Sequence, residues 1–348
     1  MIRLNKGDKI AVVSLSAGTL GEPFCSHQLE VGSKRLKDFG FEVVYMENAL
    51  KGIDFVKAHP EKRAEDLLNA FADKSIKGIF CAIGGDDTFR LAPYLFTEEA
   101  QQTIRSNPKF FMGYSDTTVD HLMLYKMGLN TFYGLSVLTC FCELDAEMLP
   151  YSKASFENIF TSEPFEYHPS NIWYEERTDF SPAALGTPRK SHPDTKGYEL
   201  LQGNPKFGGH LMGGCVESLY DLTMGERYPE EKEMNERFGI FPDAEALRGA
   251  VVFLETSEEQ PEPHKLYEMI KQLKEKGLFT GINGILVGKP QNEAYYEEYK
   301  DVYLELIDDS VPVLYNLNFG HAYPKMLMQY GAHAEIDSEE NTIRIERV

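Results

Sequence analysis

Short apolar runs alternate with helical patterns along the first part of the chain. Strands are predicted where β-branched and aromatic residues cluster, at residues 10–15, 41–46, 79–83 and 109–112. Helices are predicted where apolar side chains recur at helical spacing, at residues 26–39, 60–73 and 117–127. The predicted strands are apolar on both faces. This order therefore predicts a parallel sheet covered by helices on both sides.

The periodic pattern thins after Glu163 and returns near residue 198. From Pro164 to about Pro205 the chain is rich in Pro, Ser, Thr, Asp and aromatic residues, and it includes the single tryptophan, Trp173. An aperiodic run of this length is either a linker or a functional loop. Strand and helix patterns then resume as far as residue 307, and residues 332–348 alternate in the manner of a closing hairpin.

We therefore expect an α/β protein with two domains. The first is a doubly wound, largely parallel N-terminal domain over residues 1–163, and the second is a smaller α/β C-terminal domain over residues 206–348. Residues 164–205 are expected to form a linker and substrate loop. A chain of 348 residues is long enough for two domains that each bury a core.

Charge and hydropathy narrow the choice of partners. The formal net charge of −20 disfavours nucleic acid, which needs an excess of Lys and Arg, and it also disfavours an anionic membrane surface. No apolar stretch approaches the roughly 20 residues that span a bilayer. Charges at Lys6, Asp8 and Lys9 precede only a short apolar run, which predicts a first strand and not a signal peptide. We expect a cytoplasmic protein.

The cysteines indicate buried thiols in a reducing compartment. There are five of them, an odd number in a long chain, which does not suggest a disulfide framework. The sequence has no C-x-x-C pair and no Cys/His spacing typical of zinc, so we expect no metal site.

One strand end carries a candidate nucleophile. The stretch F-F-M-G-Y-S-D-T-T-V-D passes from a strand into a helix at Ser115, the kind of corner that presents a nucleophilic hydroxyl at the top of a sheet. Backbone N–H groups at the start of the helix would favour a developing oxyanion there. The same residues also suit an ordinary helix cap, and G-x-S-D meets only half of the G-x-S-x-G pattern. Both interpretations stay open on this motif.

A glycine pair ends the preceding strand in C-A-I-G-G-D-D-T. Gly84 and Gly85 offer backbone N–H groups with no side chain in the way, which suits an oxyanion hole. The motif also resembles the G-G-D-[GD]-[ST] phosphate loop of several ATP- and NAD-directed kinases, although no second phosphate loop follows. A tight turn that simply needs two glycines is a third interpretation.

A nucleophilic serine needs a base and an orienting acid. Among the nine histidines, His321 stands out because N-L-N-F-G-H-A-Y-P places it in a Gly-His turn after a strand and beside aromatic residues. Glu255 ends the apolar strand A-V-V-F-L-E, where a carboxylate is partly desolvated and can hold an imidazole. An exposed acidic turn is the alternative for Glu255, because Glu258 and Glu259 follow at once.

Taken together, G-Y-S-D, I-G-G-D-D, F-L-E-T-S-E-E, F-G-H-A-Y-P and H-L-M-G-G-C-V-E-S-L at 210–219 resemble the LD-carboxypeptidase family of serine peptidases. The resemblance covers nearly the whole chain. It implies that Ser115 is the nucleophile, Glu255 the acid and His321 the base. It also implies oxyanion donors on the backbones of Gly85 and Asp116, with the Asp116 side chain free to cap the helix or meet the substrate.

The resemblance further implies a homodimer that needs no cofactor, with the serine in the N-terminal domain and the acid and base in the C-terminal domain. Gly84 would lie beside the substrate.

Two branches of the family differ in substrate. One releases terminal D-alanine from cell-wall tetrapeptides; the other resembles microcin C immunity peptidases, which cut the amide between an aminoacyl group and a modified nucleotide. We favour the second, because the 164–205 segment carries Trp173, whose ring could stack on a nucleobase. Trp173 could equally anchor the loop or a dimer. The kinase remains an alternative from another class, and a non-catalytic two-domain receptor is disfavoured because it needs no Ser-Glu-His set.

Overall fold

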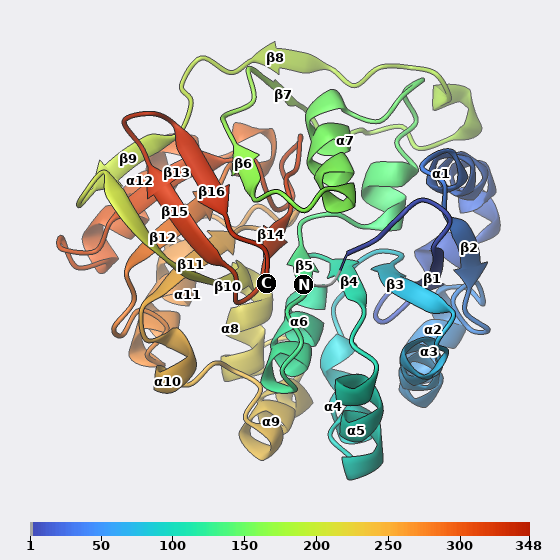
Figure 1. The fold of residues 1–348 in the computed structure, drawn as a ribbon. Helices are drawn as coiled ribbons and strands as arrows, with labels where there is room; N and C mark the ends of the chain where they lie inside the picture. The colour runs from blue at the N-terminus through green and yellow to red at the C-terminus, as the bar shows by residue number, and fades with distance from the viewer. Residues whose placement is uncertain (1–2) are drawn as a thin grey trace.

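The computed structural model describes residues 3–348, whose two large sheets lie in two domains side by side (Figure 1). Five parallel strands make up most of the first sheet, in the spatial order β5-β4-β3-β1-β2, and β14 pairs antiparallel with β5 at one edge. Their bounds are β1 Lys9–Val13, β2 Glu42–Tyr45, β3 Ile76–Cys81, β4 Phe110–Gly113, β5 Phe132–Tyr133 and β14 Met328–Gln329.

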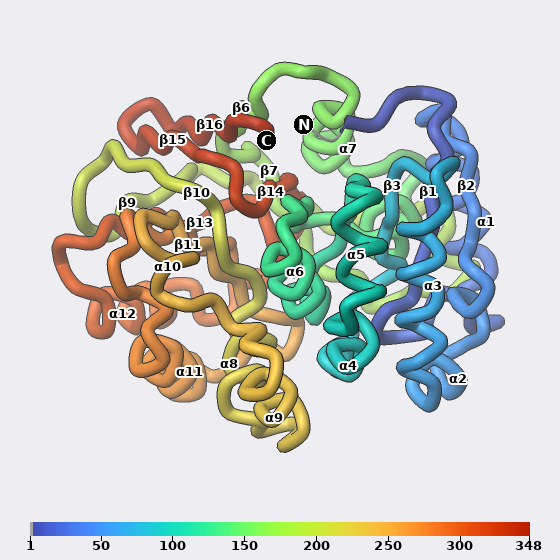
Figure 2. Tube along the Cα trace, turned by 60° about the horizontal axis from the view of Figure 1, so that its bottom comes forward, coloured from blue at the N-terminus to red at the C-terminus, as the bar shows by residue number. Residues whose placement is uncertain are grey.

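Helices cover both faces of this sheet, as the apolar pattern predicts. On one face α3 and α5 contact each other, and on the other α1 packs with the π-helical segment Val137–Phe141 (Figures 1 and 2). The helices of this half are α1 Ser26–Asp38, α2 Ile53–Ala58, α3 Pro60–Ala72, α4 Ala92–Leu95, α5 Glu98–Ser106, α6 Thr117–Lys126 and α7 Pro150–Glu157.

The second sheet has a parallel centre and antiparallel edges. Strands β10 to β13 are parallel, β15, β16 and β6 extend one side, and β9 closes the other. Their bounds are β6 Phe165–Tyr167, β9 Glu199–Gln202, β10 Lys206–Cys215, β11 Ala250–Glu255, β12 Gly284–Gly288, β13 Val313–Leu317, β15 His333–Asp337 and β16 Thr342–Ile345. The helices are α8 Val216–Met224, α9 Pro229–Phe238, α10 Ala244–Leu247, α11 Pro263–Glu275 and α12 Tyr296–Leu306.

The α/β class, the parallel-rich sheets and the closing hairpin are confirmed, and the segment between the expected domains differs from expectation. Within 164–205, β6 and β9 join the second sheet, and β7 Ile172–Tyr174 pairs with β8 Ser191–Pro193. Strand β9 follows the pattern that returns near residue 198, whereas strands of three residues such as β6, β7 and β8 are too short to show a period of two. With β6 and β9 the second sheet has eight strands against six in the first.

The two domains are joined by residues 318–327, the crossing segment, which run from the second domain back to the first. After β13 the chain crosses over to the first sheet, where β14 pairs with β5 and the Tyr330 N–H donates to the Thr131 carbonyl at 2.9 Å. The crossing segment carries His321, so this return brings His321 to the strand ends of the first domain.

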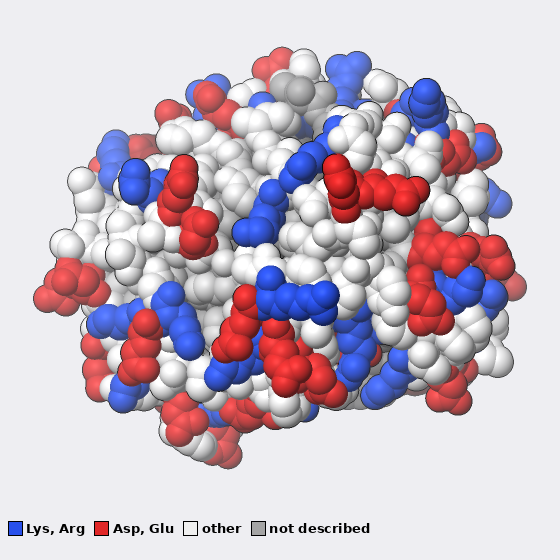
Figure 3. Space-filling model, turned by 90° about the horizontal axis from the view of Figure 1, so that it is seen from below, with Lys and Arg blue, Asp and Glu red and all other residues white. Residues whose placement is uncertain are grey.

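Charged side chains cover the surface in mixed groups. On the face in Figure 3, acidic side chains gather in several groups with basic side chains between them, in keeping with the net charge of −20. Within residues 3–348, no helix combines the length and the apolar composition that crossing a bilayer requires.

The packing of the first domain against the crossing segment can be tested at Gly134. Gly134 has φ 138°, and a Cβ there would press into the Met326 carbonyl oxygen on the crossing segment. Gly128 also has a positive φ, 88°, but a Cβ there would meet nothing within 4 Å. We expect Gly134→Ala to lower the free energy of unfolding by about 1–3 kcal/mol more than Gly128→Ala does, because only the first adds an overpacked contact. Urea denaturation measures both, and equal losses would contradict this account of the junction.

Candidate active site

Ser115 lies at a strained corner between β4 and α6. Its φ is 67°, a left-handed conformation that is uncommon for a residue other than glycine. Its carbonyl accepts hydrogen bonds from the Thr118 N–H at 2.8 Å and the Thr118 hydroxyl at 2.7 Å. Its side chain does not cap α6: the hydroxyl oxygen faces the His321 ring, with 3.1 Å between Oγ and Nε2. The strained corner therefore presents the hydroxyl to an imidazole from the other domain.

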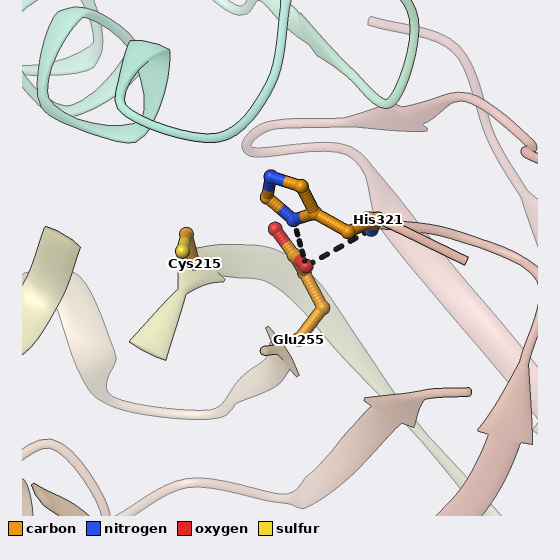
Figure 4. A group of neighbouring side chains, drawn as sticks. All are labelled: Cys215, Glu255 and His321. Atoms are coloured by element: carbon orange, nitrogen blue, oxygen red, sulfur yellow. Dashed lines mark hydrogen bonds and ion pairs between the residues drawn. The ribbon is translucent and has the colours of Figure 1, made fainter. Parts of the chain in front are cut away.

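The other ring nitrogen of His321 is held by Glu255, which ends β11. Nδ1 lies 2.7 Å from Glu255 Oε2, and the His321 backbone N–H donates to the same oxygen at 3.1 Å (Figure 4). The Tyr133 hydroxyl donates to the second oxygen, Oε1, at 2.6 Å. Both carboxylate oxygens are satisfied and buried, which fixes the direction in which the imidazole points.

Two residues that hold the serine, the glutamate and the histidine in place, Tyr133 and Lys325, belong to no motif that the sequence shows. Tyr133 also accepts the Ser115 N–H at 3.2 Å, so one phenol touches both the serine and the glutamate. Lys325 is fully buried, and its Nζ donates to the carbonyls of Gly320 and Ala322 on either side of His321. Both lie far in sequence from the groups they hold, and only the fold reveals them.

The Gly84–Gly85 turn packs directly against the serine. A Cβ on Gly84 would lie 2.7 Å from Ser115 Cβ and 2.9 Å from Ser115 Oγ, so a side chain is excluded there. Within residues 3–348, the N–H groups of Gly85 and Asp116 have no hydrogen-bond partner. The structure thus brings both expected oxyanion donors beside Ser115 with unused N–H groups, and their role stays a prediction.

The Asp116 side chain departs from expectation. It is neither free nor a helix cap, because its carboxylate accepts the Ser16 hydroxyl at 2.6 Å and the Thr88 N–H at 2.9 Å. Ser16 Oγ in turn accepts the Asp86 N–H at 2.9 Å. Burial raises the pKa of Asp116 to about 6. This carboxylate therefore fixes the glycine turn, a connection across about one hundred residues that short motifs cannot show.

Glu258 is a further neighbour of the imidazole. Its Oε2 lies 3.0 Å from His321 Nε2, the nitrogen that also faces Ser115. Burial lowers the pKa of His321, but the charges and hydrogen bonds of Glu255 and Glu258 outweigh burial and raise that pKa to about 10. In this arrangement the imidazole holds both protons at neutral pH. Glu258 therefore competes with Ser115 for the ring and opposes its use as a base.

Cys215, at the end of β10, completes a cluster of possible metal ligands. Its sulfur and the nearest ligand atoms of Glu255 and His321 lie within 4.8 Å of one another (Figure 4). The two His321 nitrogens already face Glu255 and Ser115, and burial raises the pKa of the Cys215 thiol, which keeps it protonated. The ring geometry suits proton transfer better than metal ligation.

A large cavity of about 550 Å³ opens beside Ser115 and His321. Its lining includes the aromatic residues Phe24, Tyr114, Phe180 and Tyr323 and the cations Arg177 and Arg189. Gly84 and Gly85 lie on its wall. Trp173 is not among the residues that line it: the ring is mostly buried and stacks on His192 at 4.3 Å between centroids. The structure therefore does not bring Trp173 to this cavity, and its contact with substrate stays a prediction.

Comparison with known proteins identifies the family. The N-terminal domain of LD-carboxypeptidase matches residues 10–134, and the C-terminal domain of LD-carboxypeptidase matches residues 208–336. The chain thus belongs to the LD-carboxypeptidase family, a family of peptidases.

Named relatives come from both branches. A "Probable murein peptide carboxypeptidase" of Bacillus subtilis is 28% identical over 99% of this chain and 93% of its own. The microcin C7 self-immunity protein MccF of Escherichia coli is 26% identical over 90% of this chain and 86% of its own. A crystal structure of an MccF-like protein from Streptococcus pneumoniae in complex with AMP has 48% identity and a TM-score of 0.94, and covers 97% of this chain and 98% of its own.

The contact between Glu258 and His321 predicts a pH effect. Only the neutral imidazole can accept a proton, so kcat/KM for hydrolysis rises as pH passes the pKa of His321. We expect Glu258→Gln to move this rise to lower pH by roughly half to one unit, since it removes one of the charges that raise the pKa, and the Glu258 side chain is 65% exposed and partly screened. The pH profile of kcat/KM measures the shift.

Glu259→Gln is the matched control, because Glu259 pairs with Arg227 and not with His321. Its profile should stay at the wild-type position. A Glu258→Gln profile that is unchanged, or that moves to higher pH, would contradict the assigned effect on His321.

Proposed function

We propose that the protein is a serine amidase that cuts the amide between an aminoacyl group and a nucleotide-like leaving group, in the manner of microcin C immunity peptidases. The observation that carries this proposal is the alignment of Ser115 Oγ, the His321 ring and the Glu255 carboxylate, at 3.1 Å and 2.7 Å, on the wall of the large cavity. A nucleophile, a base and an orienting acid in hydrogen-bond reach are the requirements for acyl transfer through serine.

The reaction proceeds by acyl transfer. His321 Nε2 takes the proton of Ser115 as Oγ attacks the carbonyl carbon, and Glu255 holds the imidazole and stabilises the imidazolium. The N–H groups of Gly85 and Asp116 donate to the oxyanion of the tetrahedral intermediate. His321 then gives its proton to the leaving amine, the C–N bond breaks, and water releases the acyl group from Ser115 by the same steps.

The leaving group belongs in the large cavity, because His321 borders that cavity and must protonate the leaving amine. Aromatic rings there suit stacking with a base, whereas Arg177 and Arg189 already pair with Glu143 and Glu176 on the same wall. The S. pneumoniae relative in complex with AMP supports a nucleotide as the favoured leaving group.

The second candidate is an LD-carboxypeptidase that releases D-alanine from muropeptide tetrapeptides, which the Bacillus subtilis relative favours. The phosphotransferase alternative lacks support, because the chain belongs to a peptidase family and its glycine turn packs on Ser115. A cytoplasmic location and a homodimer are also part of the proposal, and sedimentation of the purified protein tests the dimer.

Replacement of the nucleophile tests the chemistry. We expect Ser115→Ala to lower hydrolysis by more than about 10³-fold while the unfolding midpoint stays near that of the wild type, because the change removes only the attacking oxygen. Ser106→Ala, at the exposed end of α5, is the control and should keep full activity. Wild-type rates in Ser115→Ala would refute the proposed function.

A product assay separates the candidate substrates. The purified protein is incubated with an aminoacyl-sulfamoyl adenosine and with a muropeptide tetrapeptide, in EDTA and without added nucleotide, and the products are identified by mass. Free amino acid from the first supports the favoured branch, and D-alanine from the second supports the other. Loss of all turnover in EDTA, restored by Mg²⁺ and ATP, would instead select the phosphotransferase.

A further inference from the structure

Ser115 borders a second, narrower hollow besides the large cavity. This acidic pocket has a volume of about 30 Å³ and shares Gly85, Ser115 and Glu258 with the large cavity. Seven carboxylates and a single cation line it: Asp86, Asp116, Glu217, Asp221, Glu231, Glu258, Glu259 and Arg227. The hollow therefore brings a large excess of acidic over basic side chains to one side of the serine.

The two hollows lie on different sides of the reacting bond. Of the two, His321 borders the large cavity, so the leaving amine that it protonates lies there. Ser115 borders both, and the acyl group that it accepts must extend away from the leaving amine. The acidic pocket is thus placed to meet the acyl part of the substrate.

Most of the pocket's carboxylates already have partners. Hydrogen bonds or ion pairs join Asp86 to Tyr228, Asp116 to Ser16, Glu217 to Ser257, Asp221 and Glu259 to Arg227, and Glu258 to His321. These pairs account for six of the seven carboxylates and for Arg227, the pocket's cation.

Glu231 differs from these six. It lies in α9, is only 2% exposed, and within residues 3–348 its carboxylate takes part in no hydrogen bond or ion pair. Burial, followed by the charges of Asp116 and Asp221, raises its pKa to about 10. Its carboxyl oxygens are not fully closed off from solvent, so they can reach a group in the pocket, and a cation placed beside them would restore the ionised form. Glu231 is therefore an unused acceptor on the wall of the pocket.

We propose that the acidic pocket binds a primary ammonium group on the acyl residue of the substrate, with Glu231 as its principal partner. This inference rests on the proposed amidase function and names the acyl group that the site selects. The volume of about 30 Å³ is enough for a group of the size of a water molecule, which includes an ammonium group. The ammonium belongs to the α-amino group or to the end of a lysine-type side chain.

A bound metal ion explains the pocket less well. Metal ions need ligand atoms that converge on one point. Within the described chain, no three of the pocket's carboxylates bring oxygens to within 4.8 Å of one another. An ammonium group donates in three separate directions and suits dispersed acceptors.

The test compares amide substrates that share one leaving group. The acyl residues are L-lysyl and L-norleucyl, each with a free and with an acetylated α-amino group, so that the side-chain and α-ammonium are removed separately. We expect removal of the bound ammonium to lower kcat/KM by about tenfold to a hundredfold, since a charge-assisted hydrogen bond is lost. A lower kcat/KM for the norleucyl than for the lysyl substrates identifies the side-chain ammonium as the bound group. A lower kcat/KM for the acetylated than for the free substrates identifies the α-ammonium. Equal kcat/KM for all four substrates would overturn the proposal.

The isosteric variant Glu231→Gln assigns the effect to one residue. It should remove most of the preference for the ammonium-bearing substrate, whereas Glu230→Gln, exposed on the same helix, should keep it. A preference that survives intact in Glu231→Gln would overturn the role of that residue, and its unfolding midpoint checks that the variant folds. If the wild type cleaves no amide at all, or Ser115→Ala keeps its activity, the proposed function has failed; hydrolysis by the wild type without a preference for ammonium is a failure of this inference alone.

Discussion

The whole site depends on how the Glu255 carboxylate is held. Three hydrogen bonds converge on it, from the Tyr133 hydroxyl of the first domain and from the ring and backbone of His321 on the crossing segment. A buried carboxylate is stable only when its oxygens are satisfied, so the three groups are locked together by the cost of leaving any one out. The same few atoms thus tie the first domain to the crossing segment and set the direction of the imidazole.

Much of the fold follows from apolar periodicity. Strands β1, β3 and β4 contain the apolar runs 10–13, 79–81 and 110–112, which are buried because both faces of the sheet are covered. Helices α3 and α6 follow from helical spacing. Strand β9 lies where the pattern resumes near residue 198, whereas β6 and the pairing of β14 with β5 carry no such signal. Two or three residues cannot display a period, and the partners of these strands are distant in sequence.

The candidate site divides in the same way. Ser115, Glu255 and His321 each lie at a turn after a strand, a place that the sequence marks locally, and the structure brings the three side chains together. What the sequence does not mark are contacts between distant segments. In the sequence alone, Tyr133 has the pattern of an ordinary strand residue, and Glu231 is one of several acidic residues on a polar helix. The Asp116 side chain has the position of a helix cap. Only the fold shows what these three side chains contact.

The crossing of β14 into the first sheet has a consequence for synthesis. As the chain leaves the ribosome, the parallel strands of the first sheet can form early, but the edge of β5 has no partner until Met328–Gln329, far downstream in the sequence, have also emerged. An exposed strand edge is a site for unwanted pairing. The nascent first domain therefore depends on the distant segment 321–329 both to close that edge and to receive His321, and a chain that stops before this segment would have neither.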